Sequence, residues 1–376
     1  MRVDYNVPVE GGRITDDTRI RASLPTLLYL IDHGARLVLA SHLGRPKKGP
    51  TPEFSLAPVA ARLHDLLGRP VAIAPDSVGP EVKRLAGELA DGAVLLLENV
   101  RFHPEEEKND EAFARQLIAD SGATVFVNDA FGTAHRAHAS TAGVARHVQR
   151  AVAGLLMEKE LRYLGLALHA PEHPFVAVLG GAKVSDKIQV IESLLPRVDA
   201  LLIGGGMAYT FFRAQGLPTG KSLVEEEKTS LARGLLERSG GKLRLPTDHV
   251  VASAFKDDAE RRVLPVDQVP DGWMGLDIGP RTSERFAAEV RGARLVLWNG
   301  PMGVFEMKPF ADGTLAVARA LAECQGTTIV GGGDSVAAIT QMGLADRIDH
   351  VSTGGGASLE FLAGDELPGV ACLEDD

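Results

Sequence analysis

The segment Thr328–Ser335 constrains the fold more than any other part of the chain. It reads Thr-Ile-Val-Gly-Gly-Gly-Asp-Ser, and helix-forming residues follow it. This order predicts a strand, a tight turn and a helix. Glycines let a ligand approach the backbone closely, and the free N–H groups at the start of the helix favour an anion such as phosphate. Asp334, expected at the N-cap, could hold a metal ion bound to that phosphate. The alternative is an ordinary glycine-rich loop in which Asp334 only caps the helix.

The same alternation of apolar strands and amphipathic helices recurs along all 376 residues. Because the strands are almost continuously apolar, we expect parallel sheets covered by helices on both faces. A chain of this length suggests two domains. The sequence therefore predicts an α/β protein with two doubly wound, Rossmann-like domains joined by a helix. The expected strands are 36–40, 94–99, 124–128, 175–179, 199–203, 248–252, 294–298 and 327–330.

Composition excludes several classes of protein. The net charge of −10 argues against a general nucleic-acid binder. No apolar run reaches the length of a membrane span, and the first residues do not resemble a signal peptide. Cys324 and Cys372 lie far apart in the sequence, which fits a reducing compartment. We therefore expect a cytoplasmic protein that binds neither nucleic acid nor membrane.

Polar and basic residues follow the strands of the first half. In open α/β sheets, ligands bind beyond the carboxyl ends of the strands. Several arginines that converge there predict a site for a phosphorylated carboxylic acid, because arginine binds both groups with two hydrogen bonds. His135 and His138 could be metal ligands, but no third ligand is near them in the sequence. The charged run 105–108 is expected to be a solvated loop. The residues at these positions are Asp4, Asn6, His42, Arg45, Arg101, His103, Asp129, His135, Arg136 and His138, with Arg19 expected just before the first helix.

Glycine clusters follow the strands of the second half. Backbone amides that approach a polyphosphate chain would account for them. Lys183 and Lys187 are expected on one face of the helix that begins after residue 182, where either could reach a phosphoryl group. Glu306 could accept hydrogen bonds from ribose hydroxyls. The glycine clusters are Gly180–Gly181, Gly204–Gly206, Gly300, Gly331–Gly333 and Gly354–Gly356.

Two familiar nucleotide motifs do not fit the chain. The segment Gly216–Ser222 resembles a Walker A loop but has three residues between its glycines instead of four, and no expected strand precedes it. No G-x-G-x-x-G sequence follows a strand, so a dinucleotide site is unsupported.

Eight segments together resemble the phosphoglycerate kinase family. They occur in the family's order and cover nearly the whole chain. They are Arg2-Val-Asp-Tyr-Asn-Val-Pro8, Ser41-His-Leu-Gly-Arg-Pro46, Leu97-Glu-Asn-Val-Arg-Phe-His103, Asn128-Asp-Ala-Phe-Gly-Thr-Ala-His-Arg-Ala-His138, Gly180-Gly-Ala-Lys-Val-Ser-Asp-Lys187, Trp298-Asn-Gly-Pro301, Gly331-Gly-Gly-Asp-Ser335 and Ser352-Thr-Gly-Gly-Gly-Ala357.

The resemblance implies a monomer of two domains that close about a hinge. It implies a 3-phosphoglycerate or 1,3-bisphosphoglycerate domain at 1–153, an interdomain helix at 154–170, a domain for MgADP or MgATP at 171–360, and a final segment, 361–376, that returns to the first domain. It implies that Arg19, Lys187 and Lys183 are catalytic. The acid substrate would be bound by Asp4, Asn6, Arg19, His42, Arg45, Arg101 and Arg136. The nucleotide would be bound by Lys183, Lys187, Gly275, Asn299, Glu306, Gly332, Gly333, Asp334 and Ser335, with Mg²⁺ at Asp334.

The sequence departs from the family's pattern at two places, and two alternative functions remain open. Ser335 is a mild variation, whereas Met1 directly before Arg2 leaves only a fragment of the family's first strand. We therefore expect either an upstream start or a short, frayed first strand. The rivals are another small-metabolite kinase on a similar frame, and a two-domain protein that closes on a phosphorylated ligand without chemistry.

Overall fold

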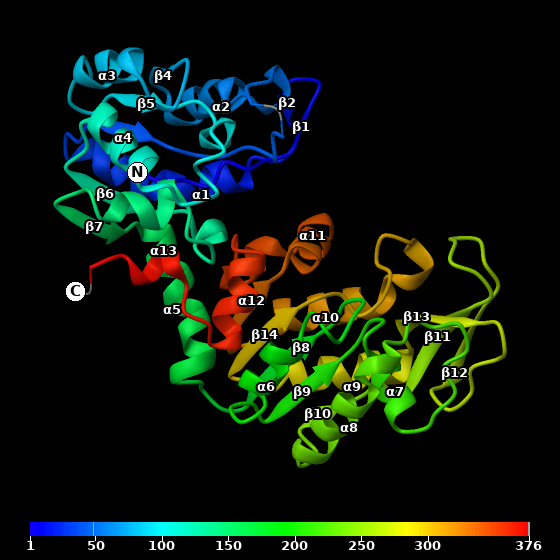
Figure 1. Ribbon diagram of the computed structural model, residues 1–376. Helices are drawn as coiled ribbons and strands as arrows, with labels where there is room; N and C mark the ends of the chain where they lie inside the picture. Colours follow the sequence, from blue (N-terminus) through cyan, green and yellow to red (C-terminus); the bar gives the residue numbers. More distant parts are fainter. Residues whose placement is uncertain (48, 375–376) are drawn as a thin grey trace. The chain divides into compact units, whose positions relative to one another are not determined.

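The chain divides into two compact units. Residues 1–47 and 49–374 are described in the computed structural model. Unit 1 comprises Met1–Leu161 and Glu366–Asp376, and unit 2 comprises Arg162–Asp365 (Figure 1). Helix α5, Leu155–His169, begins in unit 1 and ends in unit 2. None of the helices in the described residues is long and apolar enough to cross a bilayer.

Unit 1 is an α/β unit with short parallel strands. Its strands are β1 (Val9–Glu10), β2 (Arg13–Ile14), β3 (Leu37–Leu39), β4 (Val71–Ile73), β5 (Val94–Leu96), β6 (Val125–Asn128) and β7 (Arg150–Ala153). Its helices are α1 (Thr18–Asp32), α2 (Ala57–Leu67), α3 (Pro80–Gly87), α4 (Glu111–Ser121) and α13 (Pro368–Ala371), with short turns η1 (Pro52–Phe54), η2 (Val100–Phe102), η3 (Phe131–Thr133) and η4 (Ala139–Gly143).

Arg2 connects the two parallel sheets of unit 1. One sheet has the order β3-β5-β4, and β6 pairs with β7 in the other. The backbone at Arg2 forms parallel bridges to Ala40, directly after β3, and to Asn128 in β6. Arg2 therefore lies between the β3 side and the β6 side of unit 1. The chain reverses its direction of travel across the sheet at this point, which makes it the topological switch point where ligands bind.

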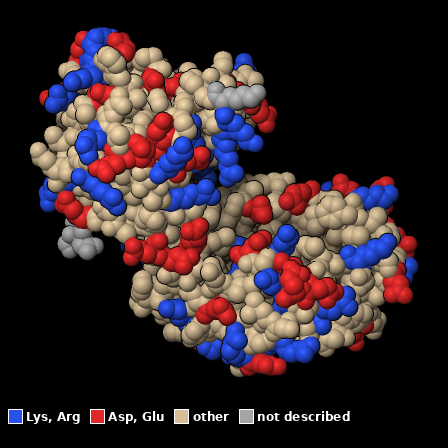
Figure 2. Space-filling model, viewed as in Figure 1, with Lys and Arg blue, Asp and Glu red and all other residues tan. Residues whose placement is uncertain are grey.

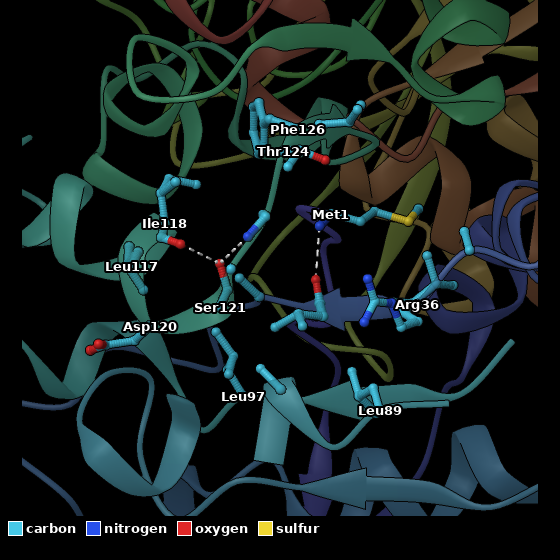
Figure 3. Close-up of a pocket in the computed structure, with 18 of the residues that line it drawn as sticks. Met1, Arg36, Leu89, Leu97, Leu117, Ile118, Asp120, Ser121, Thr124 and Phe126 are labelled. Carbon is cyan, nitrogen blue, oxygen red and sulfur yellow. Dashed lines mark hydrogen bonds between the residues drawn. The ribbon is translucent and has the colours of Figure 1, made fainter. Parts of the chain in front are cut away.

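The first strand expected from the sequence is reduced to this bridge. The ammonium group of Met1 donates to the Val38 carbonyl at 2.8 Å, and burial lowers its pKa to about 5. Next to Met1 lies a cavity of about 780 Å³, which Arg36, Leu117 and Phe126 help to line (Figure 3).

Two apolar clusters lie on the faces of these sheets. One packs Val3 and Tyr5 against Leu27 of α1 and Leu63 of α2. The other packs Leu95 of β5 against α3 and α4. The segment after unit 2 also belongs to unit 1, because the Gly369 N–H donates to the Ala134 carbonyl at 2.8 Å and the Glu374 N–H donates to the Ala151 carbonyl at 2.8 Å.

Unit 2 contains a six-stranded parallel sheet and a three-stranded antiparallel sheet. Its strands are β8 (Phe175–Leu179), β9 (Ala200–Ile203), β10 (Leu243–Arg244), β11 (Asp248–Ala252), β12 (Arg261–Pro265), β13 (Met274–Ile278), β14 (Leu295–Asn299), β15 (Thr327–Gly331) and β16 (His350–Val351). Its helices are α6 (Ile188–Leu194), α7 (Ala208–Ala214), α8 (Thr229–Arg238), α9 (Pro280–Arg291), α10 (Asp312–Glu323), α11 (Gly333–Gln341) and α12 (Gly356–Ala363), with short turns η5 (Glu226–Lys228), η6 (Lys308–Phe310) and η7 (Ala345–Arg347).

The large sheet has the order β10-β9-β8-β14-β15-β16. The chain runs from β8 toward one edge and later from β14 toward the other, so the switch point lies between β8 and β14. The α/β class with parallel sheets is thus confirmed. The strand predicted at 248–252 is present as β11, but its expected parallel pairing was wrong, because β11 pairs antiparallel with both β12 and β13.

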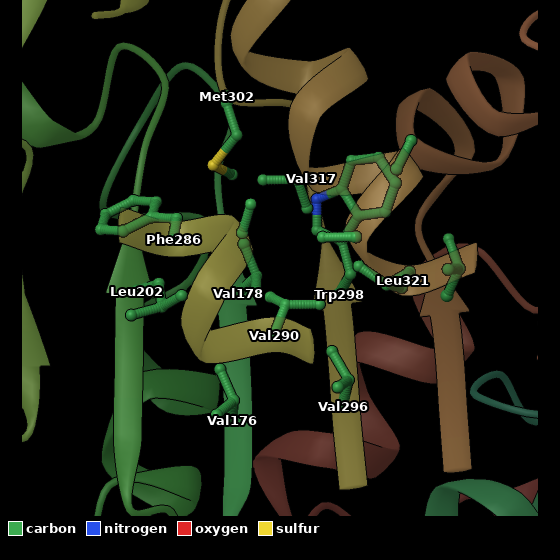
Figure 4. Close-up of a cluster of buried hydrophobic side chains, with 14 of the residues drawn as sticks. Val176, Val178, Leu202, Phe286, Val290, Val296, Trp298, Met302, Val317 and Leu321 are labelled. Carbon is green, nitrogen blue, oxygen red and sulfur yellow. The ribbon is translucent and has the colours of Figure 1, made fainter. Parts of the chain in front are cut away.

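The core of unit 2 lies between the sheet and helices α9 and α10. Val176, Val296 and Trp298 of the sheet pack against Phe286 of α9 and side chains of α10 (Figure 4). The buried Trp298 indole also donates to the Gly300 carbonyl at 2.7 Å. This bond fixes the backbone directly after β14, which is one wall of the switch point.

Candidate functional site

The predicted acid-binding residues of unit 1 meet at its switch point. Arg19 lies in the first turn of α1, not before the helix as expected. Its guanidinium donates to the Asp4 carboxylate at 3.0 Å and to the Asn6 carbonyl at 3.2 Å. The Arg19 side chain remains one-third exposed, so it is positioned by protein contacts while still open to a ligand.

A second set of bonds orders the loop after β3. The Asn6 side-chain oxygen accepts from the Gly44 N–H at 2.8 Å, and Arg101 donates to the Gly44 carbonyl at 2.9 Å. Gly44 has a φ of +61°, and a Cβ there would meet the Phe54 ring at 2.4 Å. A glycine is therefore required at this position, and the loop brings segments from three parts of the sequence together.

Charges around this loop form a basic cluster. Burial lowers the pKa of Arg101, the charges of Glu107 and Glu106 oppose this change, and the nearby Arg45 and Arg136 add to it. Arg45 and Arg136 are themselves exposed. Burial also lowers the pKa of His42 well below its usual value, and Arg2, Arg101 and Arg19 add to this effect. The arrangement concentrates positive charge at the carboxyl ends of the strands, which suits a ligand with more than one negative group.

Two polar residues expected at this edge have other contacts. Asp129 accepts from the Leu156 and Met157 N–H groups at 2.9 and 3.0 Å, so it caps the start of α5. Burial raises its pKa to about 6. His103 lies 2.6 Å from an Asp76 oxygen. Among the described residues, no group of three His, Cys, Asp or Glu side chains is arranged to hold a metal ion.

The prediction of a solvated loop at 105–108 was wrong for Glu106. Glu106 is completely buried, and its two carboxylate oxygens accept from the Ser140 N–H at 2.8 Å and from the Ser140 hydroxyl at 2.6 Å. Its counter-charge is the buried Arg2, whose field opposes the rise in the Glu106 pKa that burial causes. Glu106 lies in a run of charged residues, so its local sequence does not indicate that its side chain is buried.

A cavity of about 550 Å³ opens at the switch point of unit 2. Glycines from the loops after β8 and β9 line it together with Tyr209, Gly275, Glu306 and Asp334. The loops touch each other through their backbones: a Cβ on Gly205 would meet the Gly181 carbonyl at 2.5 Å. The absence of side chains here leaves backbone groups at the cavity surface, as an extended phosphate chain requires.

Lys187 lies at the start of α6 and is nearly buried, with 9 % of its surface exposed. Its ammonium donates to the side-chain oxygen of Asn299, the last residue of β14. Burial lowers the pKa of Lys187 to about 8, while the charges of Asp186 and Asp334 oppose this change. A partly desolvated ammonium of this kind gains most from a phosphoryl group placed beside it.

Helix α11 provides the second anion-binding element. Its N-cap is Gly332, with a φ of +86°, and Asp334 lies in the first turn rather than at the N-cap as predicted. The Ser335 hydroxyl accepts from the Gly300 N–H at 2.5 Å, which joins this helix to the loop after β14. The Asp334 carboxylate therefore lies at the cavity, beside the free N–H groups at the start of α11. These are suitable partners for a phosphate and for a hard cation bound to it.

Lys183 was expected on the same helix face as Lys187, and this is wrong. Helix α6 begins only at Ile188, with Lys187 as its N-cap, so Lys183 lies in the preceding loop. Of the predicted nucleotide-binding residues, Gly275, Glu306 and Asp334 line the cavity. Within the described residues, its lining does not include Lys183, Lys187, Asn299, Gly332, Gly333 or Ser335.

Comparisons with known proteins agree on one family. The family model described as phosphoglycerate kinase matches residues 1–365. A phosphoglycerate kinase from Moorella thermoacetica is 62% identical over 378 residues, which cover 100% of this chain and 95% of that protein. A cytosolic phosphoglycerate kinase from Triticum aestivum is 59% identical over 100% of this chain and 94% of that protein.

The chain belongs to the phosphoglycerate kinase family. The structure of phosphoglycerate kinase from Coxiella burnetii matches it with a TM-score of 0.88 and 43% identity, over 99% of this chain and 94% of that one. The resemblance stated from eight motifs is therefore confirmed, and so is the fold class.

The cavity of unit 2 contains residues that the sequence did not indicate. The Tyr209 hydroxyl bonds to His249 at 2.9 Å and packs against Gly275, where a Cβ would meet it at 1.4 Å. The Ser222 hydroxyl accepts from the Gly275 N–H at 2.9 Å. Ser222 ends the segment that resembled a Walker A loop, so that segment borders the cavity without being such a loop.

Proposed function

We propose that this chain catalyses the reversible transfer of a phosphoryl group from 1,3-bisphosphoglycerate to ADP, giving 3-phosphoglycerate and ATP. The observation that carries the proposal is the presence of two different anion sites at two sheet switch points. Unit 1 offers arginines to a phosphorylated acid. Unit 2 offers glycine loops, a helix N-terminus and Lys187 to a nucleotide.

The residues have separate tasks in this proposal. Arg101, Arg45 and Arg136 bind the phosphate and carboxylate of the acid, with His42, Asp4 and Asn6 ordering the site. Arg19 stabilises the charge on the acyl phosphate. Unlike the others, Asp4 acts through its ion pair, because a carboxylate would repel the substrate and is neutralised here by Arg19.

The nucleotide is held by the backbone around Gly332 and Gly333, by Asn299 and Ser335, and by the cavity wall at Gly275. Glu306 lies where it can accept from ribose hydroxyls. Lys187 stabilises the transferred phosphoryl group, and Lys183 adds positive charge from its loop. Mg²⁺, held through Asp334, would neutralise charge on the nucleotide phosphates.

The chemistry requires no covalent intermediate with the protein. A phosphoryl group passes between two oxygens, and the protein contributes positioning and charge stabilisation. Direct transfer requires the two bound substrates to meet in the catalytic state and water to be excluded, since water would hydrolyse the acyl phosphate. We further propose a monomer that acts in the cytoplasm. Interspersed acidic and basic side chains on the face in Figure 2 support the absence of a nucleic-acid partner.

Steady-state turnover of ATP with 3-phosphoglycerate tests the function. Two matched compounds serve as controls: glycerate, which lacks the phosphate, and glycerol 3-phosphate, which lacks the carboxylate. We expect rapid turnover with 3-phosphoglycerate alone. Turnover with another phosphorylated or unphosphorylated acid instead would support a different metabolite kinase. Tight binding of 3-phosphoglycerate without turnover would support a binding protein.

A further inference from the structure

Arg2 is buried at the switch point of unit 1, with 1 % of its surface exposed. Each of its three guanidinium nitrogens has an acceptor. Nε donates to the Ser140 hydroxyl at 2.8 Å, one terminal nitrogen donates to the Val3 carbonyl, and the other lies 3.1 Å from Nδ1 of His42. The plane of the guanidinium is therefore fixed by contacts on all sides.

The direction of these hydrogen bonds follows from the groups themselves. Arginine has only donors and does not lose its proton in proteins. The Ser140 oxygen accepts from Arg2, and its hydroxyl donates to a Glu106 carboxylate oxygen at 2.6 Å. Nδ1 of His42 must likewise accept, because a proton on it would place two donors against each other. A neutral histidine that accepts at Nδ1 carries its proton at Nε2.

We propose that Arg2 is a positioning residue that fixes His42 as the neutral Nε2–H tautomer, so that His42 serves the acid site only as a hydrogen-bond donor. The role in the acid site rests on the proposed function, whereas the tautomer does not. Glu106 and Ser140 complete the device, because they hold the guanidinium in the orientation that meets Nδ1. Burial and the charges of Arg2, Arg101 and Arg19, with His138 nearby, lower the pKa of His42 and so keep the ring neutral.

The surroundings of His42 indicate a role for it beyond packing. The Val3 carbonyl and Ser140 accept from two of the three guanidinium nitrogens, and His42 accepts from the third. The histidine is surrounded by cations, where a protonated ring would be repelled. A neutral ring with a fixed N–H is the form that can still donate to an anion there. The basic cluster thus obtains a donor without adding a further buried charge.

The tautomer can be read by long-range ¹H–¹⁵N NMR on the full chain labelled at histidine, without substrate. The signals of His42 are assigned from their loss in His42→Gln. We expect Nε2 to carry the proton and Nδ1 to carry none between pH 6 and 8. In Arg2→Met, both nitrogen signals should move toward a mixture of tautomers. Arg21→Met, which removes an exposed arginine of α1, is the control and should leave them unchanged.

The inference is wrong if the parent protein carries the proton on Nδ1, or if a folded Arg2→Met protein keeps the parent's His42 signals. Should Arg2→Met not fold, Ser140→Ala replaces it. This variant keeps the Arg2 charge but removes the hydroxyl that orients it, and we expect a partial change of the same signals. The parent spectrum alone already decides the tautomer.

Kinetics then separate the donor role from the tautomer. Glutamine places an amide nitrogen near the position of Nε2, whereas asparagine offers Arg2 an acceptor but does not extend to that position. We expect His42→Gln to keep the KM for 3-phosphoglycerate within about threefold, and His42→Asn to raise it by about tenfold, as for loss of one hydrogen bond. Equal KM values for the two variants would contradict the donor role. Absence of any turnover with 3-phosphoglycerate would instead contradict the proposed function.

Discussion

Replacing Lys187 with methionine should stabilise unit 2 while it removes activity. The ammonium of Lys187 is almost buried, and its pKa is lowered from 10.5 to about 8. Folding therefore opposes the charged form of this side chain. Methionine has a similar length and no charge, so the variant lacks this opposition.

The magnitude follows from the pKa. A drop from 10.5 to about 8 corresponds to about 3 kcal/mol that the charged side chain subtracts from stability below pH 8. Between the two pKa values the unfolded chain binds a proton that the folded chain does not, so the parent's free energy of unfolding rises with pH in this window. The variant lacks this rise. Its stability advantage over the parent should therefore shrink by about 2–3 kcal/mol between pH 7 and pH 10.

One opposing effect cancels in this comparison. The Asn299 side-chain oxygen loses its bond from Lys187, which costs about 1–3 kcal/mol at either pH. The absolute gain at pH 7 is thus reduced, but its change with pH is not.

Urea unfolding followed by tryptophan fluorescence measures the stability of unit 2, the unit that contains Lys187. The two tryptophans, Trp273 and Trp298, both lie in unit 2, so their emission reports its unfolding. Lys187→Arg, which keeps a charge, is the control and should show no gain at pH 7. In the same Lys187→Met protein we expect kcat to fall by about 10³ or more, with much smaller effects on substrate affinity. A difference in stability that does not vary with pH would refute the reasoning from burial, and a kcat within a few-fold of the parent would remove Lys187 from the mechanism.

Three further outcomes follow from the same geometry. Arg101→Ala should raise the KM for 3-phosphoglycerate by about 10- to 100-fold and leave ADP affinity unchanged, as for loss of a charge-assisted bond; Arg84→Ala, on the exposed face of α3, is the control, and equal loss of ADP affinity would argue against an acid site. Arg19→Ala should lower kcat by about 10³, and stopped assays that show only a KM effect would reduce it to a binding residue. Gly275→Ala should destabilise unit 2 by about 1–3 kcal/mol and weaken ADP binding in calorimetry, because the new Cβ would displace Tyr209; unchanged binding would exclude this wall from the nucleotide site.

The convergence of the candidate acid-binding residues could be predicted from the sequence because parallel strands present their carboxyl ends at one edge. Asp4, Asn6 and Arg19 needed only this rule, and the structure joins them by direct hydrogen bonds. The glycine clusters of unit 2 were equally informative, because a Cβ on Gly180 or Gly205 would meet backbone atoms of a neighbouring loop.

Strand direction and short strands could not be predicted. The run Asp248–Ala252 ends in Val-Val-Ala, which predicts another parallel strand, yet it pairs antiparallel because β12 and β13 lie beside it. Strands of two to four residues, such as β10, β16, β4 and β7, lack enough residues to show a period. The prediction that Lys183 and Lys187 share a helix face was wrong for a local reason, because α6 begins later than expected, at Ile188.

The network behind His42 was also missed, because it depends on residues that are distant in the sequence. Glu106 lies in a charged run, and its burial results from Arg2 and Ser140, neither of which is a neighbour in the chain. A signal was present nevertheless. Arg2 precedes an apolar strand end that must enter the sheet, and a buried arginine requires a buried acid.

Transfer of a labelled phosphoryl group tests the central claim most directly. The acyl phosphate of 1,3-bisphosphoglycerate carries ³²P, and the full chain is mixed with it in the presence and absence of MgADP and quenched within one turnover. We predict that the label passes to ATP when MgADP is present, and that no label is bound to the protein when it is absent. Failure to form labelled ATP, or label retained on the protein, would contradict direct transfer between the two substrates.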